Sequence, residues 1–474
     1  MRIANAVLTL ALTALAALSS GAGEYGTVRA KWFETVISPE VGSLIAGYAD
    51  HDVSVAKYDD LLACGLCVDD GSNRVVLVSL DLLGLDYDSI RRIRRDISAA
   101  TGAPEEGVLV SCTHTHQGPH TRMFSRQNGL QSDQGKSDAE ACIDSKYMDF
   151  LFGRIAAAAK DMMAKGEWRT CTVGFHTAMV DENRNRRYTT EENRASFNAH
   201  RPILHKLTTG IADQELGTLV LLEDNKPVYV VGNYAAHALT AHTVGLGGLR
   251  ISSDFPGFYR RYIESESGAK AMFMQGSAGD LVTKDDELGN AAAKRVGENL
   301  AMASLLSVIS VHRCNSRFVI ARPRVGGIIR SFDSRLRAQW RKRCGKERET
   351  FDIQCVAIGD VCFVGVPGET VAELGLEIKW NSPFARTYIA YLATGYYGYI
   401  TPMNLMAAGG YEPQSHRFAS RDTLKLVSTA QDAMLDLRGR LYPESNEGED
   451  AYPDNLHSPV VNMPGMYKAS KWER

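Results

Sequence analysis

Short apolar runs alternate along the chain with longer segments in which charged residues recur at helical spacing. An apolar run rich in β-branched residues is typical of a buried strand, whereas polar residues recurring about every three or four positions are typical of an amphipathic helix. The alternation predicts an α/β fold with a large mixed β-sheet and flanking helices. Strands are predicted at residues 74–83, 107–112, 226–234, 270–274, 316–323 and 387–394, with a hairpin at 354–366. Helices are predicted at residues 86–100, 146–165, 287–309, 370–379 and 422–441.

The two ends of the chain differ from this pattern. Arg2 precedes an apolar run over residues 3–18, and small residues follow at 19–22. This arrangement predicts a signal peptide over residues 1–22, and therefore a secreted or periplasmic protein. An uncleaved membrane anchor is the alternative, although a membrane span needs about 20 apolar residues. Residues 442–474 are polar with scattered prolines, which predicts an irregular C-terminal extension.

Composition narrows the class of protein without indicating a chemistry. The 474 residues include 53 Lys and Arg against 56 Asp and Glu, a formal net charge of −3, and 44% of residues are hydrophobic. These ordinary globular values disfavour a disordered chain, a collagen-like repeat and a coiled coil. The near-neutral balance also disfavours a nucleic-acid binder, which needs basic residues to neutralise phosphates. Length alone allows two or three domains of about 150 residues each.

The cysteines include one closely spaced pair. Cys64 and Cys67 form a CxxC motif inside an apolar run, and no second pair follows at zinc-ribbon spacing. Small buried side chains in a strand are therefore favoured over a redox or metal motif.

The stretch 331–349 is strongly basic. A solvated helix or loop is the default interpretation of such a charge run, and a patch that binds anionic lipid headgroups is the alternative.

The strand predicted at 107–112 is followed directly by Thr-His-Thr-His-Gln-Gly-Pro-His at residues 113–120. Residues i and i+2 of an extended chain point to the same side, so His114 and His116 can face one site. Two imidazoles at a strand end suit a metal ligand beside an acid/base group. Two histidines in a polar loop are the alternative, because an isolated His-x-His is a weak motif.

Three further groups follow predicted strands or turns. His237 ends the segment Asn-Tyr-Ala-Ala-His, either as a second ligand or as a single buried histidine. Glu369 follows a Val-Pro-Gly turn, either as a site carboxylate or as a charge that a helix N-terminus favours. A tyrosine-dense segment indicates a packed core or a substrate groove, and it comprises Tyr396, Tyr397, Tyr399 and Tyr411.

Taken in order, these motifs resemble those of the neutral/alkaline, non-lysosomal ceramidase family. The resemblance extends from about residue 36 to residue 441, and its most specific part is His-Thr-His-x-Gly-Pro followed by Asn-Tyr-Ala-x-His. The matching segments are GSLIAGY (42–48), THTHQGPH (113–120), NRNRRY (183–188), NYAAH (233–237), SSDFPG (252–257), MQGSAGD (274–280), VPGE (366–369), GYIT (398–401) and GGYE (409–412).

The resemblance implies one zinc ion and a role for each matching residue. The implied zinc ligands are His114, His237, Glu369 and Tyr399. The implied acid/base group is His116, and the implied oxyanion-stabilising groups are Tyr411 and Arg186, with Arg184 as the alternative register for the arginine. Such a site leaves a position open for water, whose pKa zinc lowers.

The implied activity is zinc-dependent hydrolysis of the N-acyl amide bond of ceramide or a related N-acyl lipid. The implied partners are a lipid or small-molecule N-acyl substrate and a peripheral membrane contact, without nucleic acid. A zinc hydrolase of a non-lipid amide, ester or lactone is the second hypothesis. A non-catalytic lipid-binding protein that retains the fold is the third.

The chain departs from the family at three places. Val282 stands where the family has a serine with a catalytic part, which puts ceramide specificity in question. His120 stands where the family usually has glycine. The 33 residues after Leu441 are too few for the family's C-terminal β-sandwich, so we expect one large catalytic domain over residues 23–441.

Overall fold

The computed structural model describes residues 25–47, 53–121, 144–189, 195–197, 210–241, 249–284, 288–314 and 318–443. The predicted signal peptide and almost all of the predicted C-terminal extension lie outside these residues. The domain boundaries at residues 23 and 441 therefore stay predictions.

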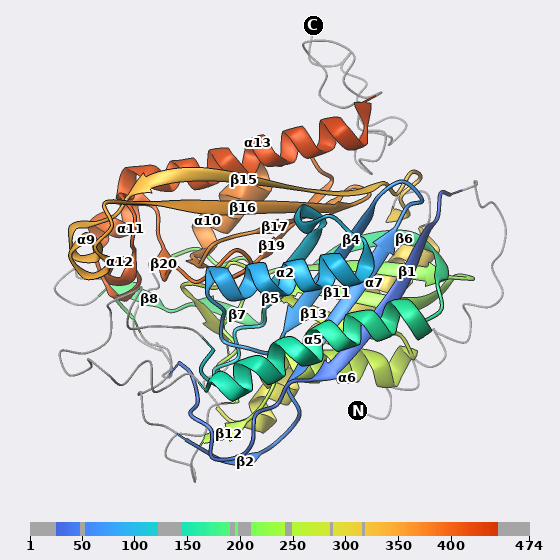
Figure 1. Cartoon of the computed structure of the whole chain (residues 1–474), viewed down its shortest axis with the longest axis horizontal. Helices are drawn as coiled ribbons and strands as arrows, with labels where there is room; N and C mark the ends of the chain where they lie inside the picture. The colour runs from blue at the N-terminus through green and yellow to red at the C-terminus, as the bar shows by residue number, and fades with distance from the viewer. Residues whose placement is uncertain are drawn as a thin grey trace, which may run out of the picture.

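Eight strands form the central sheet, in the order β13-β11-β10-β6-β1-β3-β4-β5 (Figure 1). Parallel pairs lie at its two ends, β11 with β13 and β4 with β5, and the strands between them pair antiparallel. The sheet is thus mixed, as the sequence predicts. Its strands are β1 (Val28–Val36), β3 (Leu62–Asp69), β4 (Arg74–Leu80), β5 (Val108–Cys112), β6 (Arg169–Met179), β10 (Glu215–Glu223), β11 (Lys226–Tyr234) and β13 (Lys270–Gln275).

The two faces of the central sheet bury different layers. Successive side chains of a strand point to opposite faces. In β4, Val76 and Val78 pack against helices, whereas Val75 and Leu77 pack against a second sheet. The helical layer contains α2 (Tyr87–Thr101), α5 (Ser145–Lys165), α6 (Asp254–Ser267) and α7 (Asn290–Arg313).

The second sheet has the order β15-β16-β17-β19, and helices cover its outer face (Figure 1). Its elements are β15 (Val325–Arg335), β16 (Arg348–Ile358), β17 (Val361–Gly365) and β19 (Arg386–Ala390), covered by α10 (Ala372–Trp380) and α13 (Thr423–Leu441). The molecule is therefore a four-layer helix–sheet–sheet–helix arrangement with three apolar interiors. Gly359, at φ 60°, forms the predicted turn between β16 and β17.

Twist brings the two edges of the central sheet towards each other. Neighbouring strands rotate by about 20–25°, and the rotation accumulates between β5 and β13 at opposite ends of the strand order. The hydroxyl of Ser79 in β4 donates to the carbonyl oxygen of Phe273 in β13 at 2.6 Å. The loops that follow β5 and β11 consequently meet at one end of the sheet.

Most predicted helices and strands are present within a few residues of their expected ends, but the prediction of a strand at 316–323 was wrong. Its described residues contain a single bridge between Val319 and Gly174 of β6. The segment ends at Pro323, whose nitrogen cannot donate to a strand ladder.

The default interpretation of the basic stretch 331–349, a solvated helix or loop, was wrong only at the two ends of the stretch, which belong to strands. β15 continues to Arg335, β16 begins at Arg348, and the short helix α9 (Ala338–Cys344) joins them. Exposed and buried residues alternate along the end of β15. Its charged side chains therefore occupy the solvent face of a strand.

Cys64 and Cys67 are buried residues of β3, in agreement with the structural interpretation. Burial raises the pKa of both thiols to about 12, so neither is a thiolate at neutral pH.

Short ladders extend the structure at one end of the two sheets. β7 (Asn183–Asn185) pairs with β14 (Leu281–Thr283), and β18 (Glu369–Thr370) pairs with β20 (Tyr399–Ile400). The other elements are β2 (Ser54–Lys57), η2 (Glu105–Gly107), β8 (Arg187–Thr189), β9 (Ala195–Phe197), β12 (Leu249–Ile251), α11 (Met403–Ala408), α12 (Tyr411–Ser415) and η3 (Ser420–Asp422). Within the described residues there is no separate β-sandwich domain, and no helix among them is long and apolar enough to cross a membrane.

Candidate metal centre

His114 lies in the loop that follows β5, in an unusual backbone conformation. Its φ of 65° is in the left-handed region, which a residue other than glycine adopts at a cost of about 1–2 kcal/mol. The backbone N–H of His114 donates to Leu82 at 2.9 Å. Its Nδ1 lies 2.7 Å from the carbonyl oxygen of Leu83. These two contacts turn the imidazole so that Nε2 points towards the loop after β11.

His237 reaches the same place from the loop after β11. Its Nδ1 lies 2.6 Å from the carbonyl oxygen of Ala278 and 3.0 Å from that of Leu281. The imidazole is 1% exposed. The glycine-rich loop before β14 thus fixes the second histidine as the loop after β4 fixes the first.

Glu369 comes from the short ladder of β18 and β20, which follows strand β17 of the second sheet. It is the first residue of β18, paired in register with Tyr399 of β20, and its N–H donates to Gly398 at 2.9 Å. The Tyr391 hydroxyl donates to Glu369 Oε2 at 3.2 Å, and the Tyr396 hydroxyl donates to Oε1. The carboxylate is buried, and the two tyrosines orient it.

The ligand atoms of these three residues have the spacing of a metal site. Glu369 Oε2 lies 3.4 Å from His114 Nε2 and 3.3 Å from His237 Nε2. Zinc–ligand bonds of about 2.0–2.1 Å at tetrahedral angles place neighbouring ligand atoms about 3.3–3.4 Å apart. The separations of Glu369 Oε2 from the two imidazole nitrogens therefore fit zinc.

The hydrogen bonds of His114 and His237 independently indicate a metal site. A carbonyl oxygen only accepts, so Nδ1 of His114 and of His237 must each carry the proton, and a neutral ring then has a bare lone pair on Nε2. Both lone pairs face the Glu369 carboxylate, which is also an acceptor. His237 Nε2 is buried and has no hydrogen-bond donor among the residues that the structure describes. Three acceptors in one buried place, with no proton among them, are complementary to a cation.

The ionisation of the buried groups supports this arrangement. Burial, and then the charge of Arg186, lower the pKa of His237 to about 4, so its imidazole is neutral at pH 7. Burial, and then the negative charge of Glu369, raise the pKa of Tyr399 well above its usual range.

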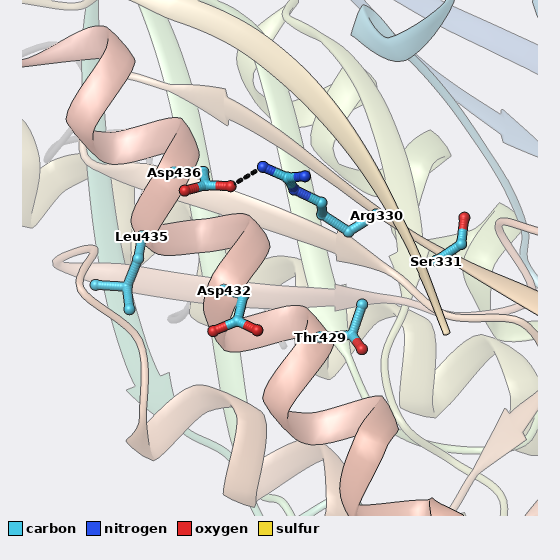
Figure 2. A pocket seen from close by; sticks show the side chains of 6 residues that line it. All are labelled: Arg330, Ser331, Thr429, Asp432, Leu435 and Asp436. Carbon is cyan, nitrogen blue, oxygen red and sulfur yellow. Dashed lines mark hydrogen bonds and ion pairs between the residues drawn. The ribbon is translucent and has the colours of Figure 1, made fainter. Parts of the chain in front are cut away.

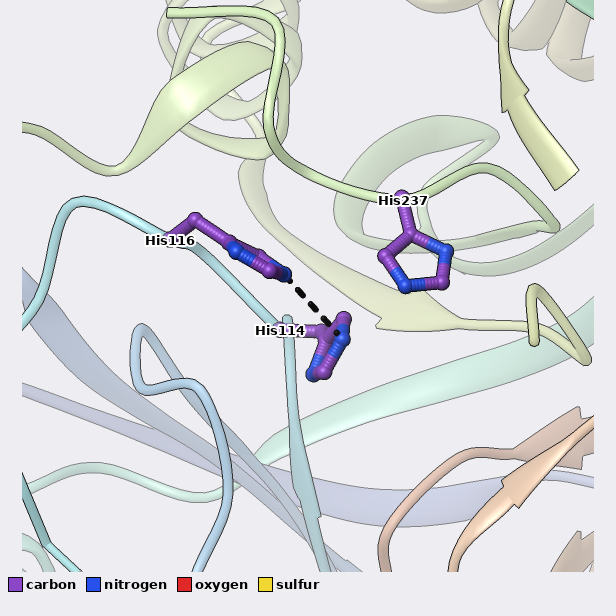
Figure 3. Close-up of side chains that lie close together, drawn as sticks. All are labelled: His114, His116 and His237. Carbon is purple, nitrogen blue, oxygen red and sulfur yellow. Dashed lines mark hydrogen bonds between the residues drawn. The ribbon is translucent and has the colours of Figure 1, made fainter. Parts of the chain in front are cut away.

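His116 joins the other two histidines (Figure 3). Its Nε2 lies 3.4 Å from His114 Nε2, and ligand atoms of the three imidazoles lie within 4.8 Å of one another. Its N–H donates to Ala238 at 3.0 Å. The ring packs on Gly47, where an added Cβ would lie 2.4 Å from His116 Nδ1. His116 is less buried than its neighbours, which suits exchange of a proton with a substrate.

Arg186 lies on the far side of Tyr399. Its Nη2 donates to the Tyr399 hydroxyl at 3.1 Å, and its guanidinium lies over the rings of Tyr399 and Tyr411 at 5.4 and 5.6 Å. Its Nε donates to Glu412 at 3.0 Å. Burial lowers the pKa of Arg186, but Tyr399 and Glu412 outweigh it and raise that pKa, so the side chain is a fixed cation.

Tyr411 is the half-exposed member of the group. Its ring meets that of Tyr399 edge to face at 5.4 Å. Burial, and then Glu369, raise the pKa of its hydroxyl, so Tyr411 is a hydrogen-bond donor at neutral pH.

The structure thus brings all seven sequence-predicted site residues into one place, from segments far apart in the chain. The structure also shows where the two candidate arginines and the departing residue Val282 lie. Arg186 reaches Tyr399, whereas Arg184 lies in β7 opposite Val282 of β14. Val282 itself is buried and bridges to His237.

Sequence reasoning missed three residues that orient the others. Tyr391 lies in an apolar run that reads as ordinary strand, so nothing in the sequence distinguished it. Arg187 and Glu412 are fully buried, and Arg187 Nη1 donates to Glu412 at 2.6 Å. Both lie in segments matched to the family, NRNRRY and GGYE, and a further charged residue in such a segment is the signal that could have identified each of them.

Comparison with known proteins identifies solved structures that share this fold. No protein-family model and no curated protein sequence matches the chain. Among solved structures, neutral ceramidase from Pseudomonas aeruginosa is 16% identical and aligns over 87% of this chain and 75% of its own, with a TM-score of 0.69. A ceramidase complexed with C2 aligns at 16% identity over 87% of this chain and 76% of its own, with a TM-score of 0.68. The chain therefore has the fold of neutral ceramidase.

Proposed function

We propose that this protein is a zinc-dependent hydrolase that cleaves the N-acyl amide bond of ceramide or a related N-acyl lipid. The observation that carries the proposal is the convergence of Glu369 Oε2 with the unprotonated Nε2 atoms of His114 and His237 at 3.3–3.4 Å. Similarity to ceramidase structures supports the substrate class.

The proposed ligands are His114, His237, Glu369 and Tyr399. Two imidazoles, a carboxylate and a phenol form a donor set that zinc accepts. Bound there, zinc supplies a Lewis acid for the amide carbonyl and lowers the pKa of water towards about 7.

The other residues handle protons and charge. His116 is the proposed base that takes a proton from the attacking water and later returns it to the leaving nitrogen, because an amine leaves only when protonated. Arg186 and Tyr411 present a cation and a hydroxyl to the same place, where they stabilise the developing oxyanion. Because Glu412 and Tyr399 hold Arg186 in advance, its charge needs no reorganisation during the reaction.

The experiment that tests this function is a hydrolysis screen. Purified protein is assayed with short-chain ceramides, N-acyl amino acids and lactones, with and without a chelator. We expect turnover of the ceramides that the chelator abolishes and added zinc restores. Turnover of only the polar substrates would instead support the hydrolase of a non-lipid amide, ester or lactone, and no turnover of any substrate would contradict both enzyme assignments.

We also propose that the protein is exported and that the mature chain begins near Gly23. The support is the sequence of the N-terminal segment alone, with its apolar run and small residues before Gly23. Mass spectrometry of protein recovered from the medium or periplasm tests this. Retention of Met1 on protein found only in the cytoplasm would contradict it.

A further inference from the structure

The hairpin between β15 and β16 ends beside the candidate site, together with the start of α13 (Figure 1). We call residues 331–349 and 420–425 the tip surface. The N–H of Ala419 donates to Arg335 at 2.8 Å, and Lys425 Nζ donates to the carbonyl oxygen of Asp333 at 3.0 Å. These contacts hold the two segments together as one surface.

The tip surface is strongly positive in a protein that is slightly negative overall. It contains nine Lys and Arg against four Asp and Glu, a net charge of +5, whereas the whole chain carries −3. Its acids do not cancel the excess. Glu347 pairs with Arg335 and Arg341. Lys342 forms no ion pair with the described residues, and Arg421 approaches its neighbouring Asp422 only to 3.9 Å.

The positive charge does not extend over the middle of α13. Figure 2 shows the surface pocket between β15 and α13, where Arg330 pairs with Asp436. Its lining residues are Arg330, Ser331, Thr429, Asp432, Leu435 and Asp436, which contain more acidic than basic side chains. The basic excess of the tip surface therefore does not continue into this pocket.

The tip surface is attached to the part of the site that meets solvent. Just before α9, Arg337 Nη1 donates to the carbonyl oxygen of Pro413 at 2.6 Å, and in α9 Trp340 Nε1 donates to that of His416 at 3.1 Å. These acceptors lie in and just after α12, the helix that begins at Tyr411.

Large apolar side chains are exposed next to these cations. Met403 is 56% exposed, Tyr411 is 44% exposed and Leu424 is 60% exposed. Thr423 Oγ1 donates to the carbonyl oxygen of Thr401, so the helices that carry Met403 and Leu424 lie together. Apolar side chains surrounded by Lys and Arg are the composition of a surface that lies in the headgroup region of a bilayer.

We propose that the tip surface docks on a bilayer containing anionic phospholipid and so presents a membrane-borne substrate at Tyr411. Charge complementarity selects this occupant, since the surface is basic and exposed apolar side chains lie next to its cations. The proposal rests on the lipid substrate proposed above, but docking itself requires no turnover.

Vesicle sedimentation tests the docking. Full-length protein is mixed with vesicles of phosphatidylcholine, or of equal parts phosphatidylcholine and phosphatidylglycerol, at low and high salt. We expect binding only to the anionic vesicles and loss of that binding at high salt. The double variant Lys342→Glu/Arg421→Glu should weaken binding about thirtyfold or more, because each basic residue near an anionic surface contributes roughly a factor of five. The double variant Met403→Ser/Leu424→Ser should weaken it as well.

The matched control is Lys146→Glu/Lys160→Glu, which reverses two exposed charges on α5. Equal weakening by the control, equal binding to both kinds of vesicle, or binding of a single-stranded oligonucleotide in place of vesicles would overturn the proposal. Hydrolysis of a water-soluble short-chain ceramide without vesicles tests the proposed function separately. Docking without such hydrolysis would leave the docking intact and contradict the function.

Discussion

The carboxylate of Glu412 accepts a hydrogen bond from Arg186 Nε at 3.0 Å in a place that solvent does not reach. The same carboxylate accepts a hydrogen bond from Arg187 Nη1 at 2.6 Å, so one buried anion pairs with two buried cations. The group retains a single positive charge, directed at Tyr399 and Tyr411. Arg186 can stabilise a developing negative charge only while Glu412 holds it in this orientation.

Replacing Glu412 with glutamine should destabilise the protein. The substitution leaves two buried guanidinium groups without an anion, and breaking such a pair typically costs about 3–5 kcal/mol. The free energy of unfolding from denaturant titration measures the loss. The control is Glu347→Gln, which removes a carboxylate that is 69% exposed from its pairs with Arg335 and Arg341. Exposed pairs contribute about 0–1 kcal/mol, so losses of similar size in the two variants would contradict the account.

Replacing Gly47 with alanine should displace His116 and lower kcat without removing the metal. The added Cβ would lie 2.4 Å from His116 Nδ1, and the φ of +97° strains the backbone as well. Gly42→Ala separates the two effects, because Gly42 has a φ of +99° with nothing within 4 Å of its added Cβ. Steady-state hydrolysis and metal content are measured for both. If Gly42→Ala lowers kcat as much as Gly47→Ala, backbone strain alone explains the result.

The hydroxyls of Tyr391 and Tyr396 should contribute to metal affinity. Each donates to Glu369, and groups that orient a metal ligand typically contribute about 10–100-fold in affinity. Tyr396→Phe should therefore raise the zinc dissociation constant within that range, measured by competition with a chelator. Tyr397→Phe is the matched control, since Tyr397 packs on Phe351 instead. Unchanged affinity in Tyr396→Phe would show that the hydroxyl does not orient the carboxylate.

Asp254 should make stability depend on pH. It is fully buried at the start of α6, and burial raises its pKa from 3.8 to about 7 despite hydrogen bonds from Ala241 and Phe255. The folded protein therefore holds this proton more tightly than the unfolded chain. The resulting stabilisation is complete below about pH 4 and is lost as the pH rises towards 7, by roughly 4 kcal/mol in total.

The difference in unfolding free energy between wild type and Asp254→Asn isolates this effect, because all other titrating groups cancel. We expect the wild type to lose stability relative to the variant as the pH rises from 4 to 7. A difference that stays constant over this range would mean that Asp254 titrates normally.

The sequence predicted the local elements well and the assembly less well. Periodicity located β11 and the turn of the β16–β17 hairpin because each is a local pattern. Periodicity failed for the strand predicted at 316–323, where Val319 makes a single bridge. The spacing of apolar residues does not show whether a neighbouring strand is available to pair with. The alternating exposure at the end of β15 was hidden by the density of arginines.

For the site, motif order selected His114, His237 and Glu369, but no sequence pattern predicts that the sheet twists until its edges meet. The sequence also cannot predict which backbone carbonyl oxygens fix each imidazole, because every residue has a backbone carbonyl group. Arg186 was preferred over Arg184 by motif register, and its contact with Tyr399 comes only from the fold.

The most direct test of the account is the zinc content of the purified protein and of Glu369→Gln. We predict one zinc per wild-type chain, and a large loss of zinc from Glu369→Gln, since the variant lacks the charge that faces His114 and His237. We also predict that hydrolysis of short-chain ceramide follows zinc content on removal and return of the metal. Wild-type protein that binds no zinc at these residues, or that hydrolyses ceramide equally well without it, would contradict the account.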